Sequence, residues 1–206
     1  MCPLGSSKLV SESEWMKTYQ CDSGSLFYES KFLVSGLTVS ADSIKRRWKV
    51  LQPSEKHEFA LAYQAKPSLS SDDEQILDFL MEVGDPNIWT TISPLLSRHT
   101  NRVKVLDFLL GRIAASEVPK ANFYQAIEAL GDSRAVEPLR AVYLKCGEAL
   151  STRYPIRKAD YLDYLQCCRA LWTLSGADEY ERTLRGFLLH DDGDVRRWAK
   201  RLLATP

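Results

Sequence analysis

A pattern of helix, glycine, short turn and second helix constrains this chain more than any other feature of its sequence. Residues 129–139 read ALGDSRAVEPL, in which Gly131 ends an apolar helical run and Pro138 lies in the first turn of the next helix. Glycine readily adopts the left-handed conformation that a sharp turn needs, and proline in a first turn removes no helical hydrogen bond. Residues 191–199 read DDGDVRRWA, an acidic helix start followed by an apolar stripe. These two stretches have the form of the two halves of a helical repeat.

The repeat recurs along the chain. Residues 79–85 (FLMEVGD) align with residues 126–132 (AIEALGD), and residues 92–95 (ISPL) align with residues 136–139 (VEPL). Gly84, Gly131 and Gly176 are separated by 47 and 45 residues, which matches the period of roughly 40–47 residues in HEAT and armadillo units. One helix pair cannot bury its own apolar face, so neighbouring pairs must stack into a continuous core.

These stretches resemble the short HEAT-like repeats of the phycobilisome-lyase type, most clearly over residues 126–139 and 191–203. The family pattern is close to A-L-G-D-x-R-A-V-x-P-L followed by D-x-D-x-V-R-x-x-A. The resemblance implies an all-α fold, a right-handed α-solenoid of about nine or ten helices stacked as antiparallel pairs. It implies no particular chemistry, because a repeat fold can carry many unrelated functions.

Apolar residues at helical spacing predict that residues 41–206 form one HEAT-like helical domain. Ser40 has the position of an N-cap, and residues 71–74 (SDDE) form an acidic helix start that suits the positive end of a helix dipole. Residues 147–159 interrupt the helical pattern with glycine, serine and proline, which predicts an inserted loop. The apolar residues within residues 1–40 follow neither a clear helical nor a clear strand periodicity, and we expect an irregular N-terminal segment that caps the stack.

Charge and cysteine content exclude several classes of protein. The 206 residues carry 27 basic and 27 acidic side chains, which argues against a protein whose whole surface binds nucleic acid or an anionic membrane through its charge.

The five cysteines form no C-x-x-C pair, which argues against a disulfide framework and a zinc site and favours a reducing compartment. No run approaches the roughly 20 apolar residues of a membrane span, and residues 1–14 lack the apolar core of a signal peptide. We therefore expect a soluble, cytoplasmic protein that does not contact membranes.

The sequence contains no signature of a catalytic site. It has no G-x-S-x-G, no Walker glycine loop, no H-E-x-x-H and no Rossmann glycine run. Deoxyhypusine hydroxylase, a di-iron enzyme built from similar repeats, carries several His-Glu pairs, whereas this chain has His57-Glu58 alone. Because one such pair cannot hold two metal ions, we interpret His57 as a solvated helix residue. The expectation is a non-catalytic protein without metal or cofactor.

Protein recognition is the function that this repeat class favours, because stacked helices expose long grooves and the loops between them lie along one edge of the stack. We expect an interaction scaffold, adaptor or regulator that binds another protein. The predicted loop supplies the candidate contacts Arg153, Tyr154, Arg157 and Lys158, since arginine and tyrosine are enriched in interface hot spots. The alternative is that this stretch is only a long connection. Trp15 and Tyr19 near the N-terminus are a second candidate contact, with the same alternative.

A nucleic-acid-binding or DNA-base-excising protein is the alternative function, because HEAT-like alkylpurine DNA glycosylases use a basic concave face with tryptophans. Residues 140–206 carry 12 basic and 9 acidic side chains, and RRW occurs at residues 46–48 and 196–198. Basic and aromatic side chains suit phosphates and stacked bases. Trp48 and Trp198 lie on the apolar stripes of their predicted helices, however, which favours core packing. The residues of this alternative are Arg196, Arg197, Lys200 and Arg201.

Overall fold

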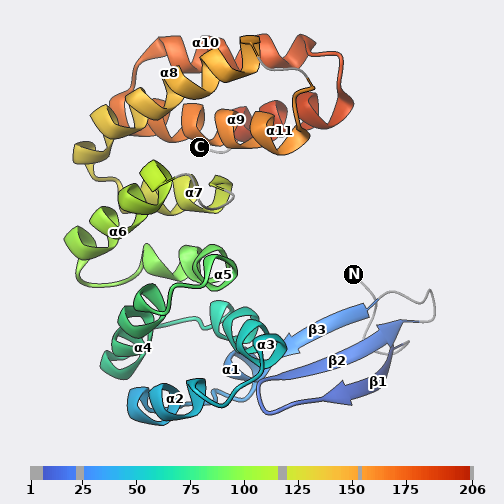
Figure 1. Ribbon diagram of the computed structural model, residues 1–206. Helices are drawn as coiled ribbons and strands as arrows, with labels where there is room; N and C mark the ends of the chain where they lie inside the picture. Colours follow the sequence, from blue (N-terminus) through green and yellow to red (C-terminus); the bar gives the residue numbers. More distant parts are fainter. Residues whose placement is uncertain (1–6, 22–25, 116–119, 153–154, 205–206) are drawn as a thin grey trace. The chain divides into compact units, whose positions relative to one another are not determined.

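The computed structural model describes residues 7–21, 26–115, 120–152 and 155–204 (Figure 1). Two compact units, Met1–Leu95 and Leu96–Pro206, divide the chain, so the boundary expected near residue 40 lies inside the first unit. Most of the described residues are helical, as predicted, but a small antiparallel sheet lies near the N-terminus. Among the described residues, no helix combines the length and the apolar character that crossing a lipid bilayer requires.

The first unit begins with a three-stranded sheet in which β2 lies between β1 and β3. Leu9 of β1 pairs with Tyr19 of β2, and Met16 of β2 pairs with Ser30 of β3. The strands are β1 (Ser7–Glu12), β2 (Met16–Cys21) and β3 (Leu26–Ser30). The expectation of irregular chain is therefore wrong for these strands. Nearly all of β1 is exposed on both faces, so its sequence shows no alternation of apolar and polar residues from which a strand is recognised.

The helices of the first unit surround an aromatic core. They are α1 (Lys31–Val34), α2 (Ala41–Trp48), α3 (Pro53–Gln64), α4 (Ser71–Glu82) and α5 (Pro86–Leu96), which ends at the boundary between the units. Trp15 is buried, and its ring lies 5.0 Å from the Phe59 ring in an edge-to-face contact. Phe32 contacts both Phe59 and Tyr63. Trp15 is therefore a core residue, and our second candidate contact is wrong for this side chain.

Asp73, in the first turn of α4, is the centre of a buried polar network. Its carboxylate accepts hydrogen bonds from the Tyr63 hydroxyl (2.7 Å), the Lys66 ammonium (2.6 Å) and both the hydroxyl and the backbone N–H of Ser70 (2.7 Å each). Burial by itself raises the pKa of Asp73, but the hydrogen bonds from Lys66, Ser70 and Tyr63 outweigh it and lower the pKa. The acidic helix start thus includes one side chain that joins α3 to α4.

The second unit is organised around one central helix, α9 (Lys158–Ser175), which packs against α7, α8, α10 and α11 (Figure 1). Buried side chains occupy consecutive positions from Tyr164 to Leu171, because neighbouring helices cover α9 on several sides. The remaining elements are α6 (Arg102–Ala115), α7 (Ala121–Leu130), the 3₁₀ turn η2 (Ser133–Ala135), α8 (Val136–Thr152), α10 (Asp178–Gly186), the 3₁₀ turn η3 (Phe187–Leu189) and α11 (Gly193–Ala204).

The prediction that the recurring glycines end helices is confirmed. Gly131 and Gly176 are the C-terminal caps of α7 and α9, and Gly84 follows α4, each with φ between 64° and 73°. Two aspartates accept hydrogen bonds from backbone amides at the starts of helical segments. Asp132 accepts from the backbone N–H of Arg134 (3.0 Å), and Asp192 accepts from that of Asp194 (2.7 Å).

Two details of the expected repeat are wrong. Pro138 lies in the first turn of α8, but Pro94, which the sequence aligns with it, lies near the end of α5. Residues 147–152 are not a loop either, because α8 continues through Gly147 to Thr152. Gly147 faces the ring of Tyr164 on α9, and this packing of α8 on α9 offsets the low helix propensity of glycine.

The cysteines also differ in part from expectation. Cys167 and Cys168 are buried free thiols in α9, whereas Cys21 at the end of β2 is disulfide-bonded. A single bridge cannot be recognised from cysteine spacing, because two cysteines need only approach each other in the folded chain.

Replacing Gly131 by alanine is expected to reduce the free energy of unfolding by about 1 kcal/mol, because alanine is strained at positive φ. A Cβ at this position would meet no atom within 4 Å, so the backbone conformation alone accounts for the cost. Gly111, inside α6, is the matched control, since a Cβ there also meets nothing within 4 Å. Gly111→Ala should raise the free energy of unfolding by about 1 kcal/mol. Urea denaturation of both variants checks the opposite signs.

Candidate functional site

The second unit contains a groove of about 510 Å³ between α8, the end of α6 and the starts of α7 and α9. We call it the α8 groove. A volume of this size lies within the usual range of ligand-binding clefts. Its apolar lining comes mainly from Ile113 of α6, Val142, Ala149 and Leu150 of α8, and Ile156 before α9.

The wall formed by α8 is an apolar helix face that the unit leaves partly uncovered. Leu139, Val142, Cys146 and Leu150 recur at spacings of three and four residues, which places them on one side of the helix. Leu139 alone among the described residues of α8 is buried, and the other three are half-buried and line the groove. The stripe therefore has the pattern of a core-facing helix, but the described residues of the unit leave it partly uncovered.

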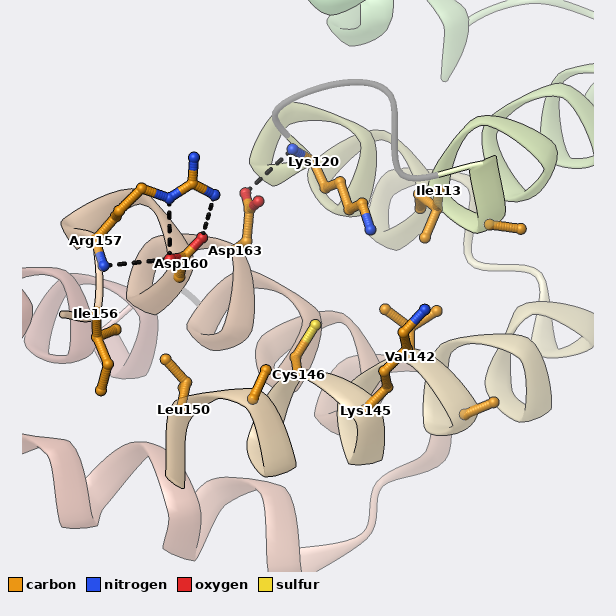
Figure 2. Close-up of a pocket in the computed structure, with 13 residues that line it drawn as sticks. Ile113, Lys120, Val142, Lys145, Cys146, Leu150, Ile156, Arg157, Asp160 and Asp163 are labelled. Atoms are coloured by element: carbon orange, nitrogen blue, oxygen red, sulfur yellow. Dashed lines mark hydrogen bonds and ion pairs between the residues drawn. The ribbon is translucent and has the colours of Figure 1, made fainter. Parts of the chain in front are cut away.

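Asp163 of α9 stabilises the start of α7 from across the groove. The residue at the N-cap position of α7, Lys120, makes no side-chain cap, and Asp163 Oδ1 accepts a hydrogen bond from its backbone N–H at 3.1 Å (Figure 2). The backbone N–H of Ala121 also donates to Asp163. Burial raises the pKa of Asp163, and these backbone hydrogen bonds counteract only part of that effect.

Asp160 interacts with Arg157 at the start of its own helix, α9. Its carboxylate forms an ion pair with Arg157, whose Nη2 lies 2.7 Å from Oδ1, and it also accepts from the Arg157 backbone N–H. Arg157 is exposed, and the attraction of Asp160 raises the pKa of its guanidinium. Both acidic side chains of the groove, Asp160 and Asp163, therefore have hydrogen-bond donors within the chain.

Two lysines bring positive charge to the groove. The side chains of Lys120 and Lys145 extend toward each other across it, from the start of α7 and from α8 (Figure 2). Lys145 is exposed, and its ammonium makes no hydrogen bond or ion pair with any residue in the described ranges.

Cys146 contributes a thiol to the wall formed by α8. It is half-buried, and burial raises its pKa above the ordinary value for cysteine. The thiol is therefore neutral at physiological pH and contributes apolar surface rather than a nucleophile.

The predicted protein contacts divide into three cases. Arg157 lines the α8 groove together with its neighbour Ile156. Lys158 points elsewhere and forms ion pairs with Asp192 (3.1 Å) and Asp194 (2.5 Å) at the start of α11. Arg153 and Tyr154 lie outside the described residues.

The basic side chains of the alternative function lie on the exposed face of α11. Arg196 donates to the carbonyl oxygens of His190 (2.5 Å) and Asp191 (2.8 Å), and Arg197 is paired with Asp194. Lys200 and Arg201 are also exposed. Acidic side chains thus lie close to the basic ones at the start of this helix.

The core packing that the sequence indicated for the two tryptophans is complete for Trp48 and partial for Trp198. Trp48 is buried in the aromatic core of the first unit, and Trp198 is half-buried in α11. His57 is exposed on α3, as interpreted from the sequence. In the described part of the chain, no cluster of three or more His, Cys, Asp or Glu side chains has an arrangement suited to a metal ion.

Sequence reasoning missed Val142, Lys145 and Cys146 as groove residues. The available signal was the apolar stripe of Leu139, Val142, Cys146 and Leu150 at helical spacing. Gly147 hides the continuity of this stripe in the sequence, because glycine in an apolar helical pattern is typical of a helix end.

Comparison of the chain with protein-family models, curated proteins and solved structures finds no match. The fold and the groove geometry are therefore the basis of the functional argument.

Replacing Asp163 by alanine should reduce the free energy of unfolding by about 1 kcal/mol, because the first amides of α7 lose their acceptor. Asp163→Asn retains one acceptor oxygen without a buried charge, and most of the stability should remain. The pKa of Asp163 is raised on folding, so its contribution to stability decreases as the pH rises from the unfolded value of 3.8 through the folded value. Urea denaturation of both proteins between pH 3.5 and 7 should show this as a difference: the stability of the wild type relative to that of Asp163→Asn should decrease as the pH rises. Equal losses in the two variants would contradict the capping role.

Proposed function

We propose that this protein is a non-catalytic adaptor, built on HEAT-like helical repeats, that binds a segment of another protein in the α8 groove. The observation that carries the proposal is the apolar face of α8, of which Val142, Cys146 and Leu150 line a groove of about 510 Å³. An apolar helix face left partly uncovered in a folded unit is typical of an interaction site. Arg157, one of the contacts that the sequence predicts, borders the same groove.

The HEAT-like arrangement belongs to the proposal. It is supported by the pairs α7–α8 and α9–α10, each joined by a turn that contains a left-handed glycine. The stacking of such pairs as a right-handed superhelix follows from the family resemblance. The disulfide of Cys21 argues against the cytoplasmic location that the cysteine pattern favoured, since reducing compartments keep thiols reduced.

The nucleic-acid alternative has less support. A phosphate-binding face needs cations that are available to the phosphates, whereas Arg196 and Arg197 already contact groups of their own chain. The experiment below tests it as a second outcome.

An affinity capture with two matched variants of α8 tests the proposal. Purified full-length protein is incubated with lysate, half of it treated with nuclease, and bound material is identified by mass spectrometry. Val142→Arg places a charge in the groove, and Leu144→Arg places the same charge on a side chain of α8 that is 63% exposed and does not line the groove.

The expected result is a stoichiometric protein partner, retained after nuclease treatment and by Leu144→Arg but lost with Val142→Arg. Capture of nucleic acid alone, with binding abolished by alanine at Arg196, Arg197, Lys200 and Arg201, would overturn the proposal in favour of the alternative. Protein capture that Val142→Arg leaves unchanged would also overturn the assignment to this groove. Thermal denaturation confirms that both arginine variants are folded.

A further inference from the structure

The charge distribution in the α8 groove indicates what chemistry its occupant has. The lining carries three basic side chains, Lys120, Lys145 and Arg157, and two acidic ones. Asp160 is paired with Arg157, and Asp163 accepts backbone hydrogen bonds at the start of α7. The ammonium group of Lys145 has no hydrogen-bond or ion-pair partner in the described ranges, and the Lys120 side chain extends toward it (Figure 2). The lining therefore has one more basic than acidic side chain, and Lys145, unpaired among the described residues, favours an acidic ligand.

The shape of the apolar lining indicates a helical occupant. Val142, Cys146 and Leu150 form a stripe two turns long along α8, with Ile156 near its Leu150 end and Ile113 near its Val142 end (Figure 2). A helix that presents apolar residues at spacings of three and four matches such a stripe along its length. A carboxylate at the edge of that apolar face would then come within reach of Lys145.

We infer that the α8 groove binds a short amphipathic helix of a partner protein, whose apolar face is bordered by aspartate or glutamate. The inference rests on the proposed function and specifies its ligand. Lys145 is the residue that selects for acidic side chains, and Val142, Cys146 and Leu150 provide the apolar contact.

A displayed library of random helical peptides of about 16 residues, which is slightly more than four helical turns, tests the inference without knowledge of the partner. The full chain is used as bait in three forms. The wild type is compared with Lys145→Glu, which reverses the groove charge, and with Lys200→Glu, which makes the same change on the exposed face of α11. Lys145 is exposed, so its replacement does not disturb packing.

The expected result is that the wild type and Lys200→Glu enrich peptides with apolar residues at helical spacing and acidic residues at their border. Lys145→Glu should enrich peptides with lysine or arginine in those positions. The best acidic peptide should bind Lys145→Glu about tenfold more weakly than it binds the wild type, as measured by fluorescence anisotropy. The difference should shrink at high salt, because the groove is open to solvent.

Alkylation of Cys146 tests whether the peptide binds along α8. Because burial raises the pKa of this thiol, N-ethylmaleimide should modify it slowly at pH 7 and faster above pH 8. A peptide seated on α8 should slow the modification of Cys146, measured by peptide mapping. The buried Cys167 and Cys168 should stay unmodified with and without peptide.

Enrichment of peptides without acidic preference, enrichment unaffected by Lys145→Glu, or absence of enrichment by the wild type would each overturn the inference. Bound acidic peptide that leaves Cys146 equally reactive would overturn it as well. These outcomes are distinct from failure of the proposed function, which depends on capture of a protein partner that Val142→Arg abolishes. A partner that enters the groove through a basic or extended segment would retain the proposed function and overturn the inference alone.

Discussion

Asp73→Ala is expected to reduce the free energy of unfolding by about 3–5 kcal/mol, which is the usual cost of removing one member of a buried charge pair. The variant takes the carboxylate away from the Lys66 ammonium and the Tyr63 hydroxyl, both of which it contacts within 2.7 Å. It also removes the capping box that joins Ser70 to Asp73 at the start of α4. Urea denaturation monitored by circular dichroism measures the loss, and hydrogen exchange should place the increased opening in α3 and α4.

Asp72→Ala is the matched control, because Asp72 lies in the same helical turn and is exposed. Its loss should reduce the free energy of unfolding by only about 0.3–1 kcal/mol, through the weaker interaction with the helix dipole. Similar losses in the two variants would show that the buried network does not contribute to stability in the way described.

The same network predicts a pH dependence. The pKa of Asp73 is lowered on folding, below the ordinary value of 3.8. The stabilising contribution of its carboxylate is thus present above the unfolded pKa and is lost as the pH falls through the folded value. The wild type should lose stability below about pH 4, and Asp73→Ala should lose correspondingly less over the same range.

Leu165→Ala in α9 is expected to cost about 2–5 kcal/mol, since it creates a cavity in the helix that packs against four others. Leu165 is completely buried. The free energy of unfolding from urea denaturation measures the effect, and hydrogen exchange should show reduced protection in α7 to α11.

Leu189→Ala is the matched control for this cavity, because the side chain of Leu189 in η3 is 88% exposed. The same chemical change at that position should alter the free energy of unfolding by less than about 0.5 kcal/mol. A loss for Leu165→Ala as small as that for Leu189→Ala would contradict the central position of α9 in the core.

Part of the candidate site could be predicted from the sequence. Arg157 was expected among the partner contacts and lines the α8 groove, whereas Lys158 of the same stretch forms ion pairs with α11. The two differ by one position in the chain, and only the folded arrangement separates a groove residue from one that joins two helices. Val142 and Lys145 were not predicted, because a helical stripe in the sequence does not reveal which of its residues a neighbour covers.

The sequence by itself determined where many of the helices begin and end. Ser40 caps α2 through a hydrogen bond from the backbone N–H of Ser43, and the glycines at 131 and 176 end α7 and α9. Such signals are readable because a cap or a left-handed turn depends on residues within about four positions of each other.

Only the tertiary structure decided the sheet of β1 to β3, the buried role of Asp73 and the groove along α8. Each depends on contacts between side chains or strands that local patterns do not specify. Asp73 has the sequence pattern of a solvated helix start, and it is buried because the end of α3 brings Tyr63 and Lys66 to its carboxylate. The physical reason is the range of the interactions: capping acts over one helical turn, whereas burial depends on which elements the folded chain brings together.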